Sequence, residues 1–280
     1  MKKSFVQAQR RQDGQRYKHD LGQHFLYDEA LLEHLVARTG VTQTDDVLEI
    51  GPGAGTLTTQ LARAARRVIA VEVDETVLPL LRLSTEKYPN VAIVQGDVRR
   101  VPLAEITRPF SEGFSVVANL PYNITTPILE LFWDSHLPVR QLSVMVQKEV
   151  ADKLLALPGD EAYGLTSVRC RYRCEPELVQ VVPATAFTPP PKVDSAFVNL
   201  PFRREPIAEV ADEALLWRMV KAGFGQRRKT LTNALKSVIE LDGDALRAIL
   251  QSMGLSPTVR GEALSVEEWI ALANAVKAAL

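Results

Sequence analysis

Residues 47–55 read VLEIGPGAG, and this stretch decides the fold class. The apolar run at 47–50 predicts a short buried strand, and the glycines that follow it predict a tight turn. Residues 56–62 continue at helical spacing. Glycine adopts positive φ without strain and lets the main chain come close to a ligand. A strand, a glycine-rich turn and a helix in this order predict a Rossmann-like α/β fold whose turn, at Gly51 and Gly53, lies against a cofactor.

The spacing of the glycines narrows the choice of cofactor. Thr56 stands where the third glycine of the dinucleotide fingerprint would fall. A pyrophosphate is therefore not the favoured ligand of this turn.

Further apolar runs lead into polar residues in the same way. Strands are expected at residues 68–71, 91–96, 114–118 and 142–146, with helical segments between them up to about residue 150. This alternation is typical of a doubly wound sheet, which binds ligands at the carboxyl ends of its strands. The strand ends would present Gly51, Glu72, Asp97 and Asn119 along one edge.

Each of these polar residues has a plausible task at that edge. Glu72 can accept hydrogen bonds from both hydroxyls of a ribose, and Asp97 can accept one from an adenine amine. Taken alone, each carboxylate is more often a helix cap or a surface charge. Their common register favours a nucleoside-containing cofactor.

Residues 119–122 read NLPY and suit a site that holds the exocyclic amine of a nucleobase. The lone pair of that amine is conjugated into the ring, so the nitrogen is a poor nucleophile. The oxygen of Asn119 and a main-chain carbonyl of the Asn119-Leu120-Pro121 turn can each accept one N–H, which favours a more pyramidal nitrogen. Pro121 stiffens the turn, and Tyr122 offers a ring for stacking. The alternative is an ordinary turn at the end of a strand.

The composition is that of an ordinary globular protein. The chain has 280 residues, of which 46% are hydrophobic and 24% charged. It contains no apolar run long enough for a membrane span and no signal-peptide core, so we expect a cytoplasmic protein that contacts no membrane. Cys170 and Cys174 lack companions at zinc spacing, and we expect no metal.

The charge distribution bears on nucleic-acid binding. The net charge of −1 and the pI near 6.5 are not typical of a nucleic-acid-binding protein. Basic side chains are nevertheless concentrated in residues 1–18 and in residues 218–236, which contain no acid. We expect RNA to bind the second group through Lys221, Arg227, Arg228 and Lys229. The alternative, that these are solvated helix faces, stays open.

Three segments are expected along the chain. Residues 1–18 would form a flexible basic arm, residues 19–204 the α/β domain, and residues 205–280 an all-helical domain that docks RNA. Helices are expected there at 211–222, 226–239, 244–253 and 265–280. The prolines within residues 187–192 predict a rigid extended loop.

The motifs together resemble one family, the bacterial small-subunit ribosomal RNA adenine N6-dimethyltransferases. The resemblance extends over nearly the whole of residues 18–270, and the matching stretches are 21–26, 49–53, 72–74, 96–97, 119–124, 147–150, 187–196 and 224–230. The resemblance implies that S-adenosylmethionine is the cofactor and that the substrate is the rRNA of an immature small subunit. The products would be two adjacent dimethylated adenosines near the 3′ end of that rRNA.

The resemblance also assigns roles to residues. His24 and Leu26 would contact the methionine part of the cofactor, and Asn119 would contact both the cofactor and the target base. His24 stands where several relatives have asparagine. Tyr122 and Phe187 would stack on an adenine that has left its helix, because a base inside a duplex cannot reach the methyl group. The alternative for Phe187, an ordinary aromatic residue of the core, stays open.

Two other functions remain open from the sequence. One is a large-subunit rRNA adenine dimethyltransferase of the antibiotic-resistance type. The other is a non-catalytic assembly or transcription factor on the same fold. We expect the chain to act as a monomer.

Overall fold

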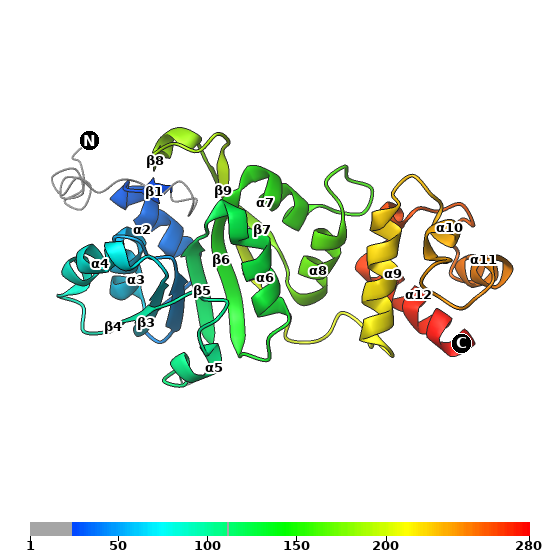
Figure 1. The fold of residues 1–280 in the computed structure, drawn as a ribbon, viewed down its shortest axis with the longest axis horizontal. Helices are drawn as coiled ribbons and strands as arrows, with labels where there is room; N and C mark the ends of the chain where they lie inside the picture. Colours follow the sequence, from blue (N-terminus) through cyan, green and yellow to red (C-terminus); the bar gives the residue numbers. More distant parts are fainter. Residues whose placement is uncertain (1–23, 111) are drawn as a thin grey trace. The chain divides into compact units, whose positions relative to one another are not determined.

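The computed structural model describes residues 24–110 and 112–280, so the expected arm at 1–18 lies outside the described residues. The chain divides into two compact units (Figure 1). Unit 1 contains the residues up to Ala151 together with Pro176–Phe202, and unit 2 contains Asp152–Glu175 together with Arg203–Leu280.

Unit 1 is built on a seven-stranded sheet with the order β4-β3-β2-β5-β6-β9-β7. Its strands are β2 (Asp46–Ile50), β3 (Arg67–Glu72), β4 (Val91–Gln95), β5 (Phe114–Asn119), β6 (Val139–Gln147), β7 (Glu177–Val182) and β9 (Ser195–Pro201). The first five of these are parallel, and β9 pairs antiparallel with both β6 and β7. The predicted Rossmann-like sheet is therefore confirmed.

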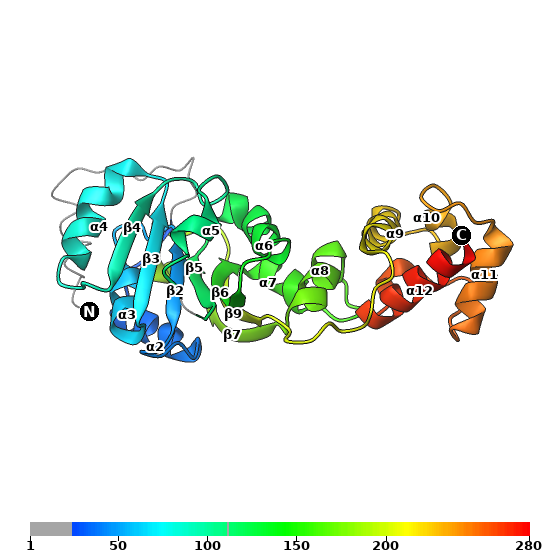
Figure 2. The same ribbon diagram turned by 90° about the horizontal axis from the view of Figure 1, so that it is seen from below.

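Helices connect the consecutive parallel strands of unit 1, and further helices precede the first of these strands and follow the last, as Figure 2 shows from a second side. They are α2 (Glu29–Arg38), α3 (Thr56–Ala64), α4 (Leu78–Thr85), α5 (Leu103–Ile106), α6 (Thr125–Trp133) and the first residues of α7 (Lys148–Leu155). Helices α2 and α3 pack through Leu35 and Leu61 into the same core cluster as Val47 and Val117 of the sheet. Because side chains alternate along a strand, Glu49 shares the sheet face of Val47 and points toward α3.

The glycine-rich turn lies between β2 and α3. Gly51, Gly53 and Gly55 all have positive φ, which a side chain would strain. A Cβ on Gly53 would also lie 2.6 Å from the Phe25 ring, so the glycine lets the segment before α2 pack directly on the turn.

A two-stranded ribbon joins parts of the chain that are distant in sequence. Strand β1 (Phe25–Leu26) pairs antiparallel with β8 (Phe187–Thr188). The expected loop at 187–192 therefore begins as a strand. Its pairing brings the proline-rich segment next to the residues that precede α2.

Unit 2 is helical. It contains the end of α7, α8 (Leu165–Arg173), α9 (Glu213–Gly225), α10 (Leu231–Leu235), α11 (Gly243–Ser252) and α12 (Val266–Ala279). The helix expected at 226–239 is wrong in its extent. Residues 226–229 form a turn, and Thr230 is extended at φ −61° and ψ 152°, so only one short helix follows.

The boundary between the units differs from the expected one at residue 204. Residues 152–175 belong to unit 2 because their apolar side chains join its core. Tyr163 and Val168 lie in one buried cluster with Leu216, Met219 and Trp269. Burial of the Tyr163 ring and its hydrogen bond to the Leu264 carbonyl, 2.8 Å long, join the two parts of the unit.

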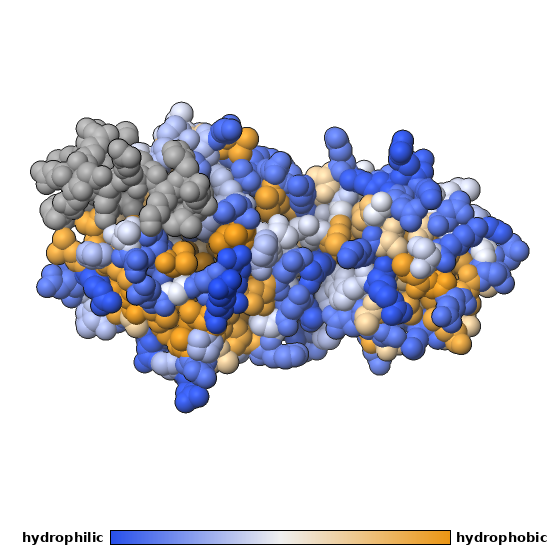
Figure 3. Space-filling model, viewed as in Figure 1, coloured by the Kyte–Doolittle hydropathy of each residue, from blue (hydrophilic) through white to orange (hydrophobic). Residues whose placement is uncertain are grey.

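The surface is mixed. In Figure 3, apolar residues form patches among polar ones on the visible face of both units, which is usual for a globular protein. Among the residues that the structure describes, no helix combines the length and the apolar content that a bilayer crossing requires.

Candidate active site

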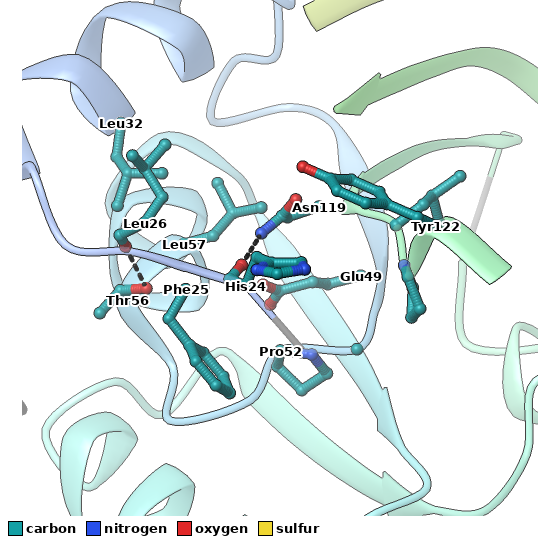
Figure 4. Close-up of a pocket in the computed structure, with 13 residues that line it drawn as sticks. His24, Phe25, Leu26, Leu32, Glu49, Pro52, Thr56, Leu57, Asn119 and Tyr122 are labelled. Carbon is teal, nitrogen blue, oxygen red and sulfur yellow. Dashed lines mark hydrogen bonds between the residues drawn. The ribbon is translucent and has the colours of Figure 1, made fainter. Parts of the chain in front are cut away.

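A cavity in unit 1 opens where β2 and β5 end (Figure 4). It is lined from three directions: the segment before α2, the glycine-rich turn with the start of α3, and the turn after β5. The lining residues are His24, Phe25, Leu26, Leu32, Glu49, Gly51, Pro52, Thr56, Leu57, Asn119, Leu120, Pro121 and Tyr122. The structure therefore brings together seven of the residues predicted from sequence, namely His24, Leu26, Gly51, Asn119, Leu120, Pro121 and Tyr122.

Asn119 is oriented by the main chain of His24. Its side-chain Nδ2 lies 2.8 Å from the His24 carbonyl oxygen. Because a carbonyl oxygen only accepts, the amide nitrogen must face it. The Oδ1 of Asn119 is thereby left as an acceptor at the cavity.

In the turn after β5, the main-chain carbonyls of Leu120 and Pro121 differ in the hydrogen bonds that they accept. The Pro121 carbonyl accepts from the Ile124 N–H at 3.2 Å and from the Thr125 hydroxyl at 3.1 Å. The N–H of Leu120 donates to the Met145 carbonyl on β6 at 3.1 Å and fixes the turn to the sheet. Within the described residues no hydrogen bond uses the Leu120 carbonyl, so this oxygen is available to accept one.

Tyr122 is held at both ends. Its main chain begins the short helix η3 (Tyr122–Ile124), and its hydroxyl lies 2.6 Å from the Ser195 Oγ on β9. Burial raises the pKa of the Tyr122 hydroxyl, and the hydrogen bond to Ser195 offsets part of this. The ring is therefore a rigid, neutral wall of the cavity. Ser195 was not singled out from sequence, because its contact joins distant segments.

Glu49 is the site residue that sequence reasoning missed. It is 1% exposed, lines the cavity, and neither of its carboxylate oxygens has a hydrogen-bond partner among the described residues. Burial raises the pKa of this carboxyl to about 8, and the charge of Glu72 raises it further, whereas the nearby Thr58 hydroxyl, which forms no hydrogen bond with it, lowers it. A buried acid without a partner is unfavourable unless a cation or a donor from a ligand satisfies it. The sequence did contain a signal for this site residue, because Glu49 is a charged residue within an apolar strand.

Glu72 supports the glycine-rich turn. Its two oxygens accept from the Gly53 N–H at 2.9 Å and from the Asp74 N–H at 2.8 Å. Burial raises the pKa of Glu72, while these two backbone hydrogen bonds lower it. Glu72 is 3% exposed and does not line the cavity, and Gly53 does not line it either. Each carboxylate oxygen keeps a second lone pair for a hydroxyl donor, so the predicted ribose contact stays a prediction.

Asp97 follows β4 and also lies outside the cavity lining. Arg99 holds it with Nε at 3.0 Å from Oδ1 and Nη2 at 2.6 Å from Oδ2. This hydrogen-bonded ion pair lowers the pKa of Asp97. A cofactor amine at Asp97 would share the carboxylate with Arg99, a partner that the sequence did not indicate.

Phe187 is placed differently from its expected role. It is 3% exposed and belongs to the core cluster that includes Leu26 and Leu32. A ring needs an open face to stack on a base, and Phe187 does not line the cavity. Of the two aromatic residues predicted to hold the base, only Tyr122 lies at the site. The β1–β8 pairing explains the burial, because it directs this side chain into the core.

The predicted RNA-binding residues lie in unit 2, around the turn after α9. Arg227 donates from Nε to Glu262 at 3.2 Å and from Nη2 to the Glu161 carbonyl at 3.1 Å, so it stabilises the unit. Lys221, Arg228 and Lys229 are exposed and form no ion pair with another described residue. These three remain the candidates for RNA contact.

The fold and the site together define an α/β methyltransferase. Its turn after β5 (residues 119–122), here called the acceptor turn, carries hydrogen-bond acceptors that suit an amino group. A Rossmann-like sheet carries a glycine-rich turn, and the turn after β5 presents Asn119 and Tyr122 beside it. Residues 14–277 match the family described as ribosomal RNA adenine dimethylase. The chain belongs to this family and is an rRNA adenine dimethyltransferase, as the motifs indicated.

Individual relatives agree with this assignment. Proteins of Bacillus mycoides and Bacillus anthracis, each named Ribosomal RNA small subunit methyltransferase A, are 44% identical over 266 residues. The aligned part covers 93% of this chain and 91% of each relative.

Solved structures show the same fold. A dimethyladenosine transferase from Plasmodium falciparum has a TM-score of 0.77 at 23% identity, covering 89% of this chain and 96% of that chain. The 23S rRNA methyltransferase ErmE has a TM-score of 0.70 at 28% identity, covering 90% of this chain and 99% of that chain.

Proposed function

We propose that this enzyme transfers methyl groups from S-adenosylmethionine to N6 of two adjacent adenosines near the 3′ end of small-subunit rRNA. Each adenosine receives two methyl groups. The observation that carries the proposal is the fixed Asn119 amide, whose Oδ1 faces a cavity that also presents the Tyr122 ring and the buried Glu49 carboxylate.

The charge and the lining of the cavity suit part of a positively charged nucleoside cofactor. S-adenosylmethionine carries an ammonium group and a sulfonium group, and Glu49 is a buried carboxylate without a hydrogen-bond partner among the described residues. Glu49 and Gly51 would hold the methionine part, with His24 and Leu26 covering it from the segment before α2. Glu72 would hold the ribose and Asp97 the adenine. When bound, this cofactor supplies a methyl group that is already activated, so the protein need only align the acceptor.

The residues of the acceptor turn make the adenine amine a better nucleophile. Asn119 Oδ1 and the Leu120 carbonyl each accept one N–H of the adenine amine, which reduces conjugation of its lone pair with the ring. Tyr122 stacks on the base and holds it in line. Pro121 keeps the two acceptors at a fixed spacing. No side chain has to act as a general base.

The substrate base must be unpaired or turned out of its helix, because its amine could not otherwise enter a cavity. Lys221, Arg228 and Lys229 of unit 2 would contact phosphates and orient the RNA without reading its sequence. We infer that the enzyme acts as a monomer in the cytoplasm, on the immature small subunit.

The names of the relatives favour the small subunit over the large one. Proteins that are 44% identical are named for the small subunit, whereas the 23S rRNA methyltransferase ErmE is 28% identical. The test is to incubate the purified protein with S-adenosylmethionine carrying a tritiated methyl group and with under-methylated small or large subunits in parallel. We expect label in the small-subunit rRNA alone. Label in the large-subunit rRNA alone would overturn the assignment.

A further inference from the structure

The His24 side chain lies on Tyr122, the residue that would stack on the target base. The two ring centroids are 5.2 Å apart and the ring planes differ by 24°, which is an offset stacked pair. Figure 4 shows the imidazole between Tyr122 and Pro52, within the ring of residues that line the cavity.

A hydrogen bond holds the imidazole in this position. Its Nδ1 lies 2.8 Å from the Pro189 carbonyl oxygen. Since that oxygen only accepts, Nδ1 carries the proton. His24 is thus attached to the acceptor turn by stacking and to the proline-rich segment by a hydrogen bond.

Tyr122 is the fixed member of the pair. Its hydroxyl is bound to Ser195 on β9, and its main chain lies in the turn that Leu120 joins to the sheet. His24 belongs to the short segment before α2 and is only partly buried. If the two rings separate, His24 is the one that moves.

A base cannot share the Tyr122 face with His24. An aromatic ring inserted between two others needs about 3.5 Å on each side, so the outer rings would have to lie roughly 7 Å apart. The observed separation is smaller. The lining side chains also leave an open volume of about 50 Å³, far below that of a typical ligand pocket.

We propose that the His24 imidazole occupies the stacking place of the target adenine on Tyr122, and that the adenine displaces it on entry. This inference rests on the proposed stacking role of Tyr122. Displacement breaks the hydrogen bond to Pro189, while the His24 main-chain carbonyl stays with Asn119. The side chain thereby keeps the cavity closed to bases that do not bind strongly enough to move it.

While the His24 ring lies on Tyr122, the target base cannot bind. The apparent affinity for RNA is therefore the intrinsic affinity multiplied by the fraction of molecules in which the ring is displaced. The first test compares His24→Ala, His24→Asn and His24→Phe at saturating S-adenosylmethionine, with under-methylated small subunits as substrate. Alanine cannot stack, and asparagine can donate to Pro189 but cannot stack. We expect the KM for the subunits to fall about threefold to tenfold in both variants.

His24→Phe is the matched control, because phenylalanine stacks but cannot donate. Its KM is expected to stay near or above that of the wild type. An unchanged or raised KM in His24→Ala, with a loss of kcat, would overturn the proposal, because it would mean that His24 supports Tyr122 and does not compete with the base. Activity of the wild-type enzyme on small subunits tests the proposed function separately.

The second test needs no turnover. The chain has four histidines, so a protein labelled with ¹³C at the histidine Cε1 gives few signals. Stacking on Tyr122 should shift the His24 proton signal upfield, and Tyr122→Ala should abolish that shift. Adenosine monophosphate is then added with S-adenosylhomocysteine.

Displacement predicts that the His24 signal moves toward its position in Tyr122→Ala as the nucleotide binds. Binding to His24→Ala but not to the wild type at equal concentration also supports displacement. Binding to the wild type with an unmoved His24 signal overturns it. If the nucleotide binds neither protein, the comparison of KM values decides.

Discussion

The side-chain Nδ2 of Asn119 lies 2.8 Å from the main-chain oxygen of His24, so a residue at the end of β5 is oriented by the segment that precedes α2. This contact determines which atom of Asn119 faces the cavity. It requires only the main chain of residue 24, so any side chain at that position preserves it.

Replacing Asn119 with alanine should remove one of the two acceptors for the adenine amine. We expect kcat for methyl transfer to fall at least about a hundredfold, as for the loss of one preorganised hydrogen bond in other active sites. Binding to immature small subunits should be largely retained, since phosphate contacts dominate affinity. Turnover equal to that of the wild type would show that the assigned role of Asn119 is wrong.

Replacing Glu49 with glutamine should change how cofactor binding depends on pH. Because the pKa of Glu49 is about 8 in the folded protein, the carboxyl is protonated below that pH and must lose its proton to pair with a cation. The wild-type affinity for S-adenosylmethionine should therefore rise from pH 6.5 to pH 8 and then level off. Glu49→Gln should bind weakly at every pH. Calorimetric titration in buffers of different ionisation enthalpy should detect proton release in the wild type only.

Glu49→Gln should weaken cofactor binding but raise the thermal stability of the protein. The folded pKa of Glu49 lies above the ordinary glutamate value of 4.5, so the folded state binds more protons between those two pH values. The contribution of Glu49 to stability is complete below about pH 4.5 and is lost as pH rises toward 8. Glu49→Gln should thus raise the melting temperature at pH 8 more than at pH 5. A lower melting temperature at pH 8 would contradict an unpaired buried carboxyl.

Tyr122 offers a pair of variants that separate stacking from hydrogen bonding. Tyr122→Phe keeps the ring and loses the hydrogen bond to Ser195, and Ser195→Ala should reproduce its small loss of activity. Tyr122→Ala loses the ring and should reduce kcat/KM for the RNA substrate by at least about fivefold, the low end of a base-stacking contribution. Equal effects of Phe and Ala would mean that the ring does not hold the base.

The basic turn of unit 2 should respond to charge reversal at its exposed positions. Arg228→Glu and Lys229→Glu should weaken RNA binding across sequences and reduce its salt dependence by about one unit of slope for each lost phosphate contact. Arg227→Ala should instead lower thermal stability, because Arg227 is bound to Glu262 and to the Glu161 carbonyl. A reversed pattern, with Arg227 carrying the salt dependence, would contradict the assignment.

The sequence predicted what depends on local pattern. Apolar runs located the parallel strands, and the glycines with positive φ located the turn between β2 and α3. Asn119 and Tyr122 were found because they directly follow a strand. Such features need only neighbouring residues to be recognised.

Features that depend on distant pairing were not predicted. The β1–β8 ribbon buries Phe187, and no local signal shows that residues 25–26 and 187–188 meet. An amphipathic pattern indicates a helix but not which core it joins, so residues 152–175 were assigned to the wrong unit. Glu49 was overlooked because its lack of a partner is visible only once the surrounding side chains are in place.

The most direct test of the central claim is to identify the methylated nucleoside. Small-subunit rRNA treated with the enzyme and S-adenosylmethionine is digested to nucleosides and analysed by mass spectrometry, with the 3′-terminal fragment analysed in parallel. The account predicts N6,N6-dimethyladenosine at two adjacent positions in that fragment. Methylation at a ribose hydroxyl or at a ring nitrogen would contradict it, because the Asn119 acceptor is assigned to an exocyclic amine.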